Sequence, residues 1–562
     1  MPSRSKRDCH RSLPPLTSGW SPPRPEASGG AGEENPYAPE RTSIETEKKQ
    51  DGVPPFPLVN ALKASGKLNA AGFHFPGHNR GRAAPSSLTE IIGLEPFIHD
   101  FNCFPEIGFQ FSPQGPISEA QKLAANLFGA LETWFLVGGT TCGIQAAIMA
   151  TCSPGDYLIL PRNSHKSAIS ALVLSGAIPK YIIPQYNYDW DIASGVLPSQ
   201  VEKAIEELEK EGQKAGGVFV TSPTYHGVCS KLSEISEVCH NHGIPLIVDE
   251  AHGAHFGFHP QLPYSALQQG ADLVVQSTHK VLCSLTQSSM LHLSTKSNVD
   301  RERISRCLQT LQTTSASNLL LASLDAARAQ LNENPKTIFN EAINLANETR
   351  NLLKNIPGIS ILDSSSSFPN FPTRDPLRLT LGFLQLGLSG YQVNEILHND
   401  LMVICELVGS RSMTFAFTLG TCREHIQRLV SSIQHVSSIN FNSLSGGGKL
   451  FVVDNEINNS VMGPLLGDIK MGLNPRDAFF SSKRKVSIEE SLGKICGELI
   501  CAYPPGIPLM FPGEIITQSV LDYLVRIAGR IREANFQYPS LSATVIDGAS
   551  DPSLSSIVIC DV

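Results

Sequence analysis

The chain has 562 residues, more than the roughly 250–300 residues at which a single hydrophobic core stops growing, so two or three domains are expected. Apolar residues make up 41% and charged residues 17% of the chain, which is ordinary for a globular protein. The net charge of −8 argues against a basic nucleic-acid-binding face, and the sequence lacks the acidic runs of a charged tail.

The first residues differ in composition from the rest. Residues 1–32 are rich in Ser, Pro, Arg and Gly, with few acidic residues (Asp8 and Glu26). Such a segment cannot bury a core, so residues 1–50 are predicted to be disordered. The same composition is typical of an organelle transit peptide. Both interpretations stay open, and the expected location is the cytoplasm or, with a transit peptide, a plastid or other organelle.

Order is expected from about Val53, and helices then alternate with strands. The helices are predicted at 113–130, 143–152, 165–175, 197–212 and 232–242, and the strands at 134–137, 156–160, 180–184, 217–221, 245–249 and 273–276. This alternation predicts a mostly parallel sheet covered on both faces. Ligands of such sheets bind outside the carboxyl ends of the strands.

The pattern changes after about Asp325. A long helix is expected over 338–354, followed by a Ser-rich break at 364–367 and a smaller α/β unit that reaches about Ile439. Gly446-Gly447-Gly448 resembles a linker. We therefore predict an N-terminal arm with a large domain over 51–325, a small α/β domain over 326–440 and a C-terminal domain over 441–562.

Cysteine usage and hydropathy indicate a reduced intracellular protein. The thirteen cysteines are scattered and lack paired Cys-x-x-Cys spacing. No apolar run approaches the roughly 18–20 residues that cross a membrane. The N-terminus also lacks the apolar region of a secretory signal.

The first candidate site cluster is Gly138-Gly139-Thr140-Thr141, which lies between a strand and a helix. A helix N-terminus presents free N–H groups and the positive end of the dipole, and two hydroxyls add donors, so this turn could bind phosphate. Gly/Thr turns are also common helix caps, and the motif alone does not decide between the two.

The second cluster, Asp249-Glu250-Ala251-His252, ends a predicted strand. A carboxylate at the mouth of a parallel sheet is a functional candidate, although it could also cap a helix. Helicases that share the letters DEAH need a phosphate loop of the form G-x-x-x-x-G-K-[ST]. Gly448-Lys449 is followed by Leu450, and Ser443 stands at the first glycine position. We therefore reject an ATPase.

The third cluster is Ser277-Thr278-His279-Lys280, after another predicted strand. Its Ser, Thr and His could hold a phosphate, and Lys280 would then reach an aldehyde on the same ring. A lysine at the edge of a largely buried site has a lowered amine pKa, which favours Schiff-base chemistry. For an isolated Ser-x-His-Lys, a solvent-exposed loop lysine would be the commoner case.

Two groups of histidines complete the candidates. His165 follows a predicted strand, where an imidazole can stack on an aromatic ligand, although a lone histidine is more often structural. His252, His255 and His259 suggest a metal, but no cysteine or carboxylate completes a ligand set at known spacings, so no metal is expected.

Together and in this order, the motifs resemble the fold-type-I pyridoxal-phosphate (PLP) decarboxylases of ornithine, lysine and arginine. The resemblance covers about residues 54–532 and is closest to the shorter bacterial-type members without an N-terminal receiver-like domain. The matching segments are Phe73-His74-Phe75-Pro76-Gly77-His78, Gly115-Pro116-Ile117-Ser118-Glu119-Ala120, Gly139-Thr140-Thr141, Pro161-Arg162-Asn163-Ser164-His165-Lys166, Ser222-Pro223-Thr224-Tyr225-His226-Gly227, Asp249-Glu250-Ala251-His252-Gly253, Ser277-Thr278-His279-Lys280, Asn474-Pro475-Arg476-Asp477-Ala478-Phe479-Phe480, Tyr503-Pro504-Pro505-Gly506-Ile507-Pro508 and Pro512-Gly513-Glu514.

The resemblance implies a fold-type-I architecture, with a seven-stranded-type, mostly parallel sheet in the large domain and smaller α/β and C-terminal decarboxylase domains. It implies that Lys280 forms the Schiff base, Asp249 pairs with the pyridine nitrogen and His165 stacks on the ring. Around them it places the phosphate ligands Thr140, Thr141, Ser277 and His279, with Ala251 and the catalytic His252 close to the ring. It also implies a homodimer or higher homo-oligomer, with the segment from Tyr503 to Glu514 near the active site and the dimer contact.

One departure concerns the substrate. Relatives often carry Thr-Glu and then an acidic pair before the Gly-Pro-Ile segment, where this chain has Asn102-Cys103 and Gly108-Phe109. An acidic pair would suit a cationic substrate, so the loss leaves the preferred substrate open. Glu406, Tyr503 and Glu514 are the predicted substrate contacts. Glu106 is a further candidate, although a solvated surface carboxylate is the commoner case there.

The expected activity is decarboxylation of lysine, ornithine or arginine to cadaverine, putrescine or agmatine, a carboxy-lyase reaction of polyamine biosynthesis. Loss of CO2 requires a proton donor to Cα, and His252 and Lys280 both remain candidates. The alternatives are another fold-type-I PLP enzyme (an aminotransferase or aromatic amino-acid decarboxylase) and a catalytically weakened regulatory relative. The expected partner is a small amino-acid substrate, with no nucleic acid and no membrane.

Overall fold

The computed structural model describes residues 55–68, 70–101, 106–111, 114–363, 367–445, 470–503, 507–537 and 545–562. They belong to one compact unit, which begins at Val53. The predicted tail 1–50, Asn102-Cys103, most of the Ser-rich break and the Gly446-Gly447-Gly448 linker lie outside the described residues. In the described part of the chain, no helix is both long and apolar enough to cross a membrane.

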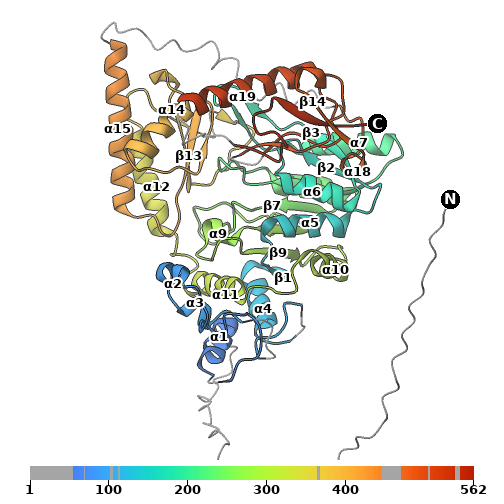
Figure 1. Ribbon diagram of the computed structural model, residues 1–562, viewed down its shortest axis with the longest axis vertical. Helices are drawn as coiled ribbons and strands as arrows, with labels where there is room; N and C mark the ends of the chain where they lie inside the picture. The colour runs from blue at the N-terminus through green and yellow to red at the C-terminus, as the bar shows by residue number, and fades with distance from the viewer. Residues whose placement is uncertain are drawn as a thin grey trace, which may run out of the picture. The chain divides into compact units, whose positions relative to one another are not determined.

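A seven-stranded sheet forms the centre of the described chain, in the order β1-β9-β8-β7-β6-β2-β3 (Figure 1). Its strands are β1 Ala130–Leu136, β2 Tyr157–Pro161, β3 Ile178–Ile182, β6 Ala215–Thr221, β7 Leu246–Asp249, β8 Leu273–Gln276 and β9 Ser289–Ser294. β9 pairs antiparallel with both of its neighbours, β1 and β8, and β2, β3, β6, β7 and β8 pair in parallel. The predicted mostly parallel sheet is confirmed, and β9 is a strand that the sequence did not reveal.

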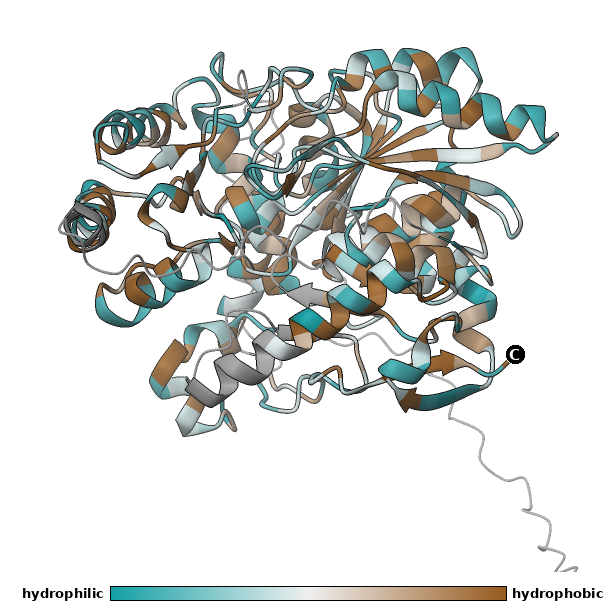
Figure 2. Cartoon of the chain, turned by 90° about the horizontal axis from the view of Figure 1, so that it is seen from above, coloured by the Kyte–Doolittle hydropathy of each residue, from teal (hydrophilic) through white to brown (hydrophobic). Residues whose placement is uncertain are grey.

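Helices bury both faces of this sheet. Successive side chains of a strand point to opposite faces and therefore join different cores. In β7, Leu246 and Val248 join a core with helices α7 and α8, whereas Ile247 joins a core with α5, α6 and α10. These helices are α5 Gly139–Thr151, α6 Lys166–Ser175, α7 Pro198–Lys210, α8 Leu232–Asn241 and α10 Arg301–Leu311. Figure 2 shows hydrophobic strands flanked by helices that carry hydrophilic residues on one side.

A third core joins the beginning of the described chain to residues 316–436. It contains Leu58, Ile117, Leu324, Ala327 and Leu379. Its helices are α1 Pro57–Lys67, α4 Pro116–Phe128, α11 Asn318–Glu333, α12 Asn340–Leu353 and α15 Arg423–Ser445. The predicted boundary between residues 325 and 326 falls inside α11, and this core extends on both sides of it. The domain limits remain predictions.

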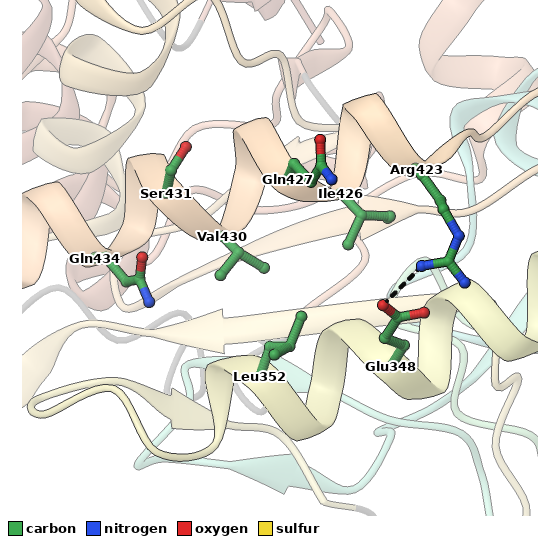
Figure 3. A pocket seen from close by; sticks show the side chains of 8 residues that line it. All are labelled: Glu348, Leu352, Arg423, Ile426, Gln427, Val430, Ser431 and Gln434. Carbon is green, nitrogen blue, oxygen red and sulfur yellow. Dashed lines mark hydrogen bonds and ion pairs between the residues drawn. The ribbon is translucent and has the colours of Figure 1, made fainter.

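The residues after α12 form a smaller antiparallel sheet, in the order β10-β11-β13-β12. Its strands are β10 Ser360–Ile361, β11 Arg378–Gly382, β12 Leu407–Val408 and β13 Ser412–Ala416. Between α12 and α15 runs a shallow groove, where Leu352 faces Ile426 and Val430 and where Glu348 pairs with Arg423 at 3.0 Å (Figure 3). None of the predicted site residues lines this groove.

The C-terminal part has a core of its own, which includes Cys496, Met510, Leu524 and Ile559. Its elements are α18 Pro475–Phe480, β14 Lys483–Ser487, η3 Glu489–Ser491, β15 Ile500–Tyr503, β16 Ile507–Met510, α19 Gln518–Gln537, β17 Val545–Asp547 and β18 Ser556–Cys560. The remaining short elements of the described chain are α2 Ser86–Ile92, α3 Glu95–Ile98, β4 Tyr186–Asn187, β5 Ile192–Ala193, α9 Thr278–Val281, η1 Leu384–Leu386, α14 Gly390–Glu395 and η2 Ile396–Asp400.

Candidate active site

Asp249 is the last residue of β7, at the carboxyl edge of the sheet, and its side chain is 3% exposed. The backbone N–H of Ala251 donates to its Oδ1 at 3.1 Å. Burial raises the pKa of the Asp249 carboxyl to about 6, although the charge of Lys280 and the Ala251 N–H both act to lower it. A buried carboxylate that is short of positive partners can bind a protonated ring nitrogen.

The neighbouring Glu250 is engaged within the protein. It accepts from the backbone N–H of Ala266 and from the side-chain amide of Gln276, both at 2.7 Å. Burial raises the pKa of Glu250 to about 8. Glu250 therefore ties the end of β7 to β8 and to the loop between them.

Lys280 lies in the single-turn helix α9, which follows β8, and it is half-buried. Its Nζ lies 3.0 Å from Nε2 of His252. Burial lowers the pKa of the Lys280 amine, the carboxylates of Asp249 and Glu406 oppose this shift, and Arg378 adds to it. A lowered amine pKa increases the fraction of neutral, nucleophilic amine.

His252 is 4% exposed and has contacts on three sides. In addition to its contact with Lys280, His252 has its Nδ1 3.3 Å from Nη2 of Arg378. The ring of Tyr225 packs edge-on against the His252 ring, with ring centroids 5.0 Å apart. Burial, followed by the charges of Lys280 and Arg378, holds the pKa of His252 well below its ordinary value. Arg378 was not predicted from the sequence, because an arginine within a strand does not reveal its own burial.

His165 is the N-cap residue of α6, and its Nδ1 accepts from the backbone N–H of Ser167 at 3.2 Å. Burial lowers its pKa to about 4, and the nearby charge of Lys280 contributes. The sequence predicted that His165, His252, Asp249 and Lys280 lie near one another, and their electrostatic coupling agrees with this arrangement.

A cluster of hydroxyls lies at the N-terminus of α5. Oγ1 of Thr140 is 2.5 Å from Oγ of Ser277 and 3.1 Å from Oγ of Ser289, while Thr141 is exposed. Nδ1 of His279 donates to the carbonyl of Ser288 at 2.9 Å. Thr140 and Thr141 belong to the first turn of α5, which begins four residues earlier than predicted. Ser289 comes from the unpredicted strand β9.

The predicted substrate residues lie in different surroundings. Glu406 is exposed and close enough to Lys280 to influence its pKa. Glu514 is 3% exposed and pairs with Arg162 at 3.2 Å, so the geometry favours a structural role for it. Glu106 is exposed, and the side chain of Tyr503 lies outside the described residues. Their substrate roles remain predictions.

The three histidines considered as metal ligands have separate partners. His252 contacts Lys280 and Arg378, His255 pairs with Asp375 at 3.1 Å, and His259 contacts Asn340 at 2.8 Å. Among the described residues no group of three or more His, Cys, Asp or Glu side chains has the arrangement of a metal site.

Comparison with known proteins identifies the family. Residues 56–374 match the model of the Orn/Lys/Arg decarboxylase major domain, and residues 466–549 match that of the Orn/Lys/Arg decarboxylase C-terminal domain. The chain belongs to the Orn/Lys/Arg decarboxylase family. Enzymes of this family use PLP.

Curated relatives and solved structures agree with this assignment. The chain is 35% identical to the arginine decarboxylase of Bacillus subtilis over 476 residues, which cover 84% of this chain and 93% of the relative. It is 25% identical to the lysine decarboxylase LdcA of Pseudomonas aeruginosa, covering 84% of this chain and 75% of that one. The crystal structure of the Francisella novicida lysine decarboxylase LdcF superposes with a TM-score of 0.76 at 22% identity, covering 90% of this chain and 81% of that one. The predicted family, its decarboxylase class and its fold-type-I architecture are confirmed.

Proposed function

We propose that this member of the Orn/Lys/Arg decarboxylase family binds PLP through Lys280 and removes the α-carboxylate of a basic amino acid. One observation carries the assignment: a half-buried amine of lowered pKa lies beside a buried carboxylate and a neutral imidazole at the carboxyl edge of the sheet. Because the curated relatives with 35% identity or more include arginine decarboxylases, arginine is the first substrate to test.

The residues present fit PLP. The Lys280 amine, whose pKa is lowered by burial, suits an aldehyde carbon, and the buried Asp249 suits a protonated pyridine nitrogen. The free N–H groups of the first turn of α5, with the hydroxyls of Thr140, Ser277 and Ser289, suit a phosphate. We assign the phosphate to these groups, to Thr141 and to His279. His165 and Ala251 are the proposed neighbours of the ring.

When bound, PLP accepts the electron pair that the Cα–carboxylate bond releases. Asp249 holds the proton on the ring nitrogen and thereby keeps the ring electron-poor. Lys280 would hold the cofactor through its aldehyde carbon. His252, with Nε2 3.0 Å from Nζ of Lys280, is placed to hold a proton where Cα must be protonated. Burial around Asp249 and His252 excludes water and favours loss of neutral CO2.

The test uses the purified full-length chain. We expect a Schiff-base absorption band on addition of PLP and release of CO2 from arginine, lysine or ornithine in preference to tyrosine. Lys280→Ala should abolish both. A band without CO2 from any basic amino acid would contradict the substrate class, and the absence of a band would contradict the cofactor assignment.

We further propose that the chain forms a homodimer. The segment before the sheet exposes large apolar side chains, including Phe73 (98% exposed), Phe75 (75%) and Ile91 (79%), which a second copy would cover. Light scattering gives the mass directly, and Ile91→Ser should weaken the assembly. For the location we propose an intracellular compartment, and a reporter fused to residues 1–50 tests whether this compartment is an organelle.

A further inference from the structure

His252 uses both of its ring nitrogens within a row of three buried or half-buried side chains. Nδ1 lies 3.3 Å from Nη2 of Arg378, and Nε2 lies 3.0 Å from Nζ of Lys280. His252 is 4% exposed and Arg378 1%. Arg378 comes from β11 in the smaller sheet, whereas the other two residues follow strands of the large sheet.

The donors and acceptors in this row allow one arrangement. A guanidinium can only donate hydrogen bonds. Nδ1 of His252 must therefore be the acceptor and cannot carry a proton, so a neutral ring is protonated on Nε2. That N–H points at Nζ of Lys280, and it requires a lone pair there. A neutral amine offers that lone pair, whereas an ammonium would place N–H against N–H.

We propose that Arg378 is a positioning residue, which fixes the Nε2–H tautomer of His252 and, through it, holds Lys280 as a neutral amine. The proposal concerns residues of this chain, and it rests on the proposed function only where Lys280 is the lysine that reacts with PLP. It assigns Nε2 of His252, rather than Nδ1, as the nitrogen that carries a proton toward the reacting atoms.

The surroundings support the arrangement. Gly227 has a φ of +82° and leaves room for Arg378, since a Cβ there would lie 2.8 Å from Cβ and 2.9 Å from Cγ of the arginine. Nε and Nη1 of Arg378 find no hydrogen-bond acceptor among the described residues, so the bond to His252 is a large part of what orients this guanidinium. The pKa of both His252 and Lys280 is lowered, first of all by burial.

Several charged groups act on Lys280 besides this row, and the test must separate them. The groups that influence Lys280, or that it influences, are Asp249, Glu406, Arg378, His165, His252 and His279. Arg378 acts on Lys280 both through its charge and, by our proposal, through His252. Arg378→Lys separates these two effects, because lysine keeps the charge while its shorter side chain falls short of Nδ1.

The first measurement is the tautomer of His252 in the full-length chain without PLP, labelled with ¹⁵N-histidine. His252→Phe identifies the signals. We expect the wild type to show an unprotonated Nδ1 and a protonated Nε2, and Arg378→Lys to show a mixture of both tautomers. A protonated Nδ1 in the wild type, or an unchanged Nε2–H tautomer in Arg378→Lys, would overturn the proposal. This readout does not depend on PLP binding or on decarboxylation.

The second measurement is the pH dependence of the rate at which Lys280 forms a Schiff base with added PLP. Arg378→Lys should move the midpoint up by about one pH unit, which slows the reaction about tenfold at lower pH. The shift should vanish in the His252→Phe background. Arg328→Lys, a change at a buried arginine that bonds to Asp325 and to the carbonyl oxygen of Pro55, should not cause it. A shift that persists without His252 would refute the proposal. If the wild type forms no Schiff base, the proposed function fails, and the tautomer still decides the present inference.

Discussion

Replacing Arg162 with methionine tests how the C-terminal part is held on the large sheet. Arg162 follows β2 and is 3% exposed. Its guanidinium donates to the carbonyl oxygens of Pro508 at 2.9 Å and Leu509 at 3.0 Å, and to Oε2 of Glu514 at 3.2 Å. It also lies over the ring of Phe511, 3.9 Å from the centroid. The substitution removes every one of these contacts together.

The expected loss of free energy depends on whether a substitution leaves a buried charge without its partner. Arg162→Met leaves the Glu514 carboxylate without its cation, and breaking such a pair costs about 3–5 kcal/mol. Glu514→Gln is milder, because an amide oxygen can still accept from the backbone N–H of Phe511, as Oε2 now does at 3.0 Å. Only the charge is lost, and we expect a cost of about 1–2 kcal/mol, the difference between charged and neutral hydrogen bonds.

Hydrogen exchange of the amides at 513–516 is the appropriate assay, because these amides bond within the C-terminal part and local opening exposes them. Since about 1.4 kcal/mol is a factor of ten, exchange should accelerate roughly a hundredfold to several thousandfold in Arg162→Met. Glu514→Gln should accelerate it roughly five- to thirtyfold. Arg484→Met, which breaks an exposed pair with Asp561, is the control and should have little effect.

The same variants decide the role of Glu514. If it holds the C-terminal part in place, Glu514→Gln changes exchange and leaves KM for the basic amino acid unchanged. If exchange in Glu514→Gln equals that of the wild type while KM rises, the structural role of Glu514 is refuted, and Glu514 binds substrate as the sequence suggested.

Two further predictions concern the substrate and the backbone. Glu406→Gln should raise KM for arginine, lysine and ornithine about two- to fivefold, the strength of an exposed ion pair, and should leave the Schiff-base band unchanged; an equal effect on tyrosine would contradict this. Gly227→Ala should lower the free energy of unfolding by about 1–3 kcal/mol more than Gly243→Ala, measured by urea unfolding, because both glycines have positive φ but a Cβ at Gly243 meets no atom within 4 Å. Equal effects of the two substitutions would exclude a clash with Arg378.

Much of the large domain could be predicted because its strands are short apolar runs. Leu246 to Val248 are buried on both faces of the sheet, and a continuous apolar run is the pattern of such a strand. The strand ends then place Asp249 and Lys280 at one edge without further information. The nearness of these two residues therefore follows from the strand pattern alone.

The sequence could not reveal β9, because polar residues interrupt its apolar run. Ser289, His292 and Ser294 are all buried there. His292 is hidden because its two nitrogens contact Gln276 at 3.0 Å and Thr133 at 2.8 Å, one on each neighbouring strand. A polar residue is satisfied in a core only by partners that the fold supplies, and those partners are distant in the sequence.

Arg378 illustrates the same limit at the candidate site. Its local sequence, Leu377-Arg378-Leu379-Thr380, alternates apolar and polar residues, and such a pattern predicts a strand whose arginine faces solvent. In the structure this arginine reaches His252, which lies 126 residues earlier in the chain. Its role depends on how the smaller sheet lies against the large one, and no local pattern encodes that.

Asp249 provides a last prediction, in which stability and activity change in opposite directions. Burial raises its pKa from an ordinary 3.8 to about 6 in the folded chain. The unfolded chain therefore loses this proton first as the pH rises, and the folded chain is destabilised relative to an Asp249→Asn variant between about pH 4 and pH 6. Because about 1.4 kcal/mol corresponds to one pH unit, the full difference is roughly 3 kcal/mol and is constant above pH 6.

Without PLP, Asp249→Asn should thus be more stable than the wild type at pH 7, and the gap in unfolding temperature should shrink toward pH 4. With PLP bound, the protonated ring nitrogen would pair with the carboxylate, so the pH dependence of the wild type should weaken. The variant should nevertheless decarboxylate about ten- to a hundredfold more slowly, because it loses a hydrogen bond to a charged group. A gap that is constant from pH 4 to pH 7 would mean that Asp249 does not ionise in a buried site, and its assignment as the partner of the ring nitrogen would lose its physical basis.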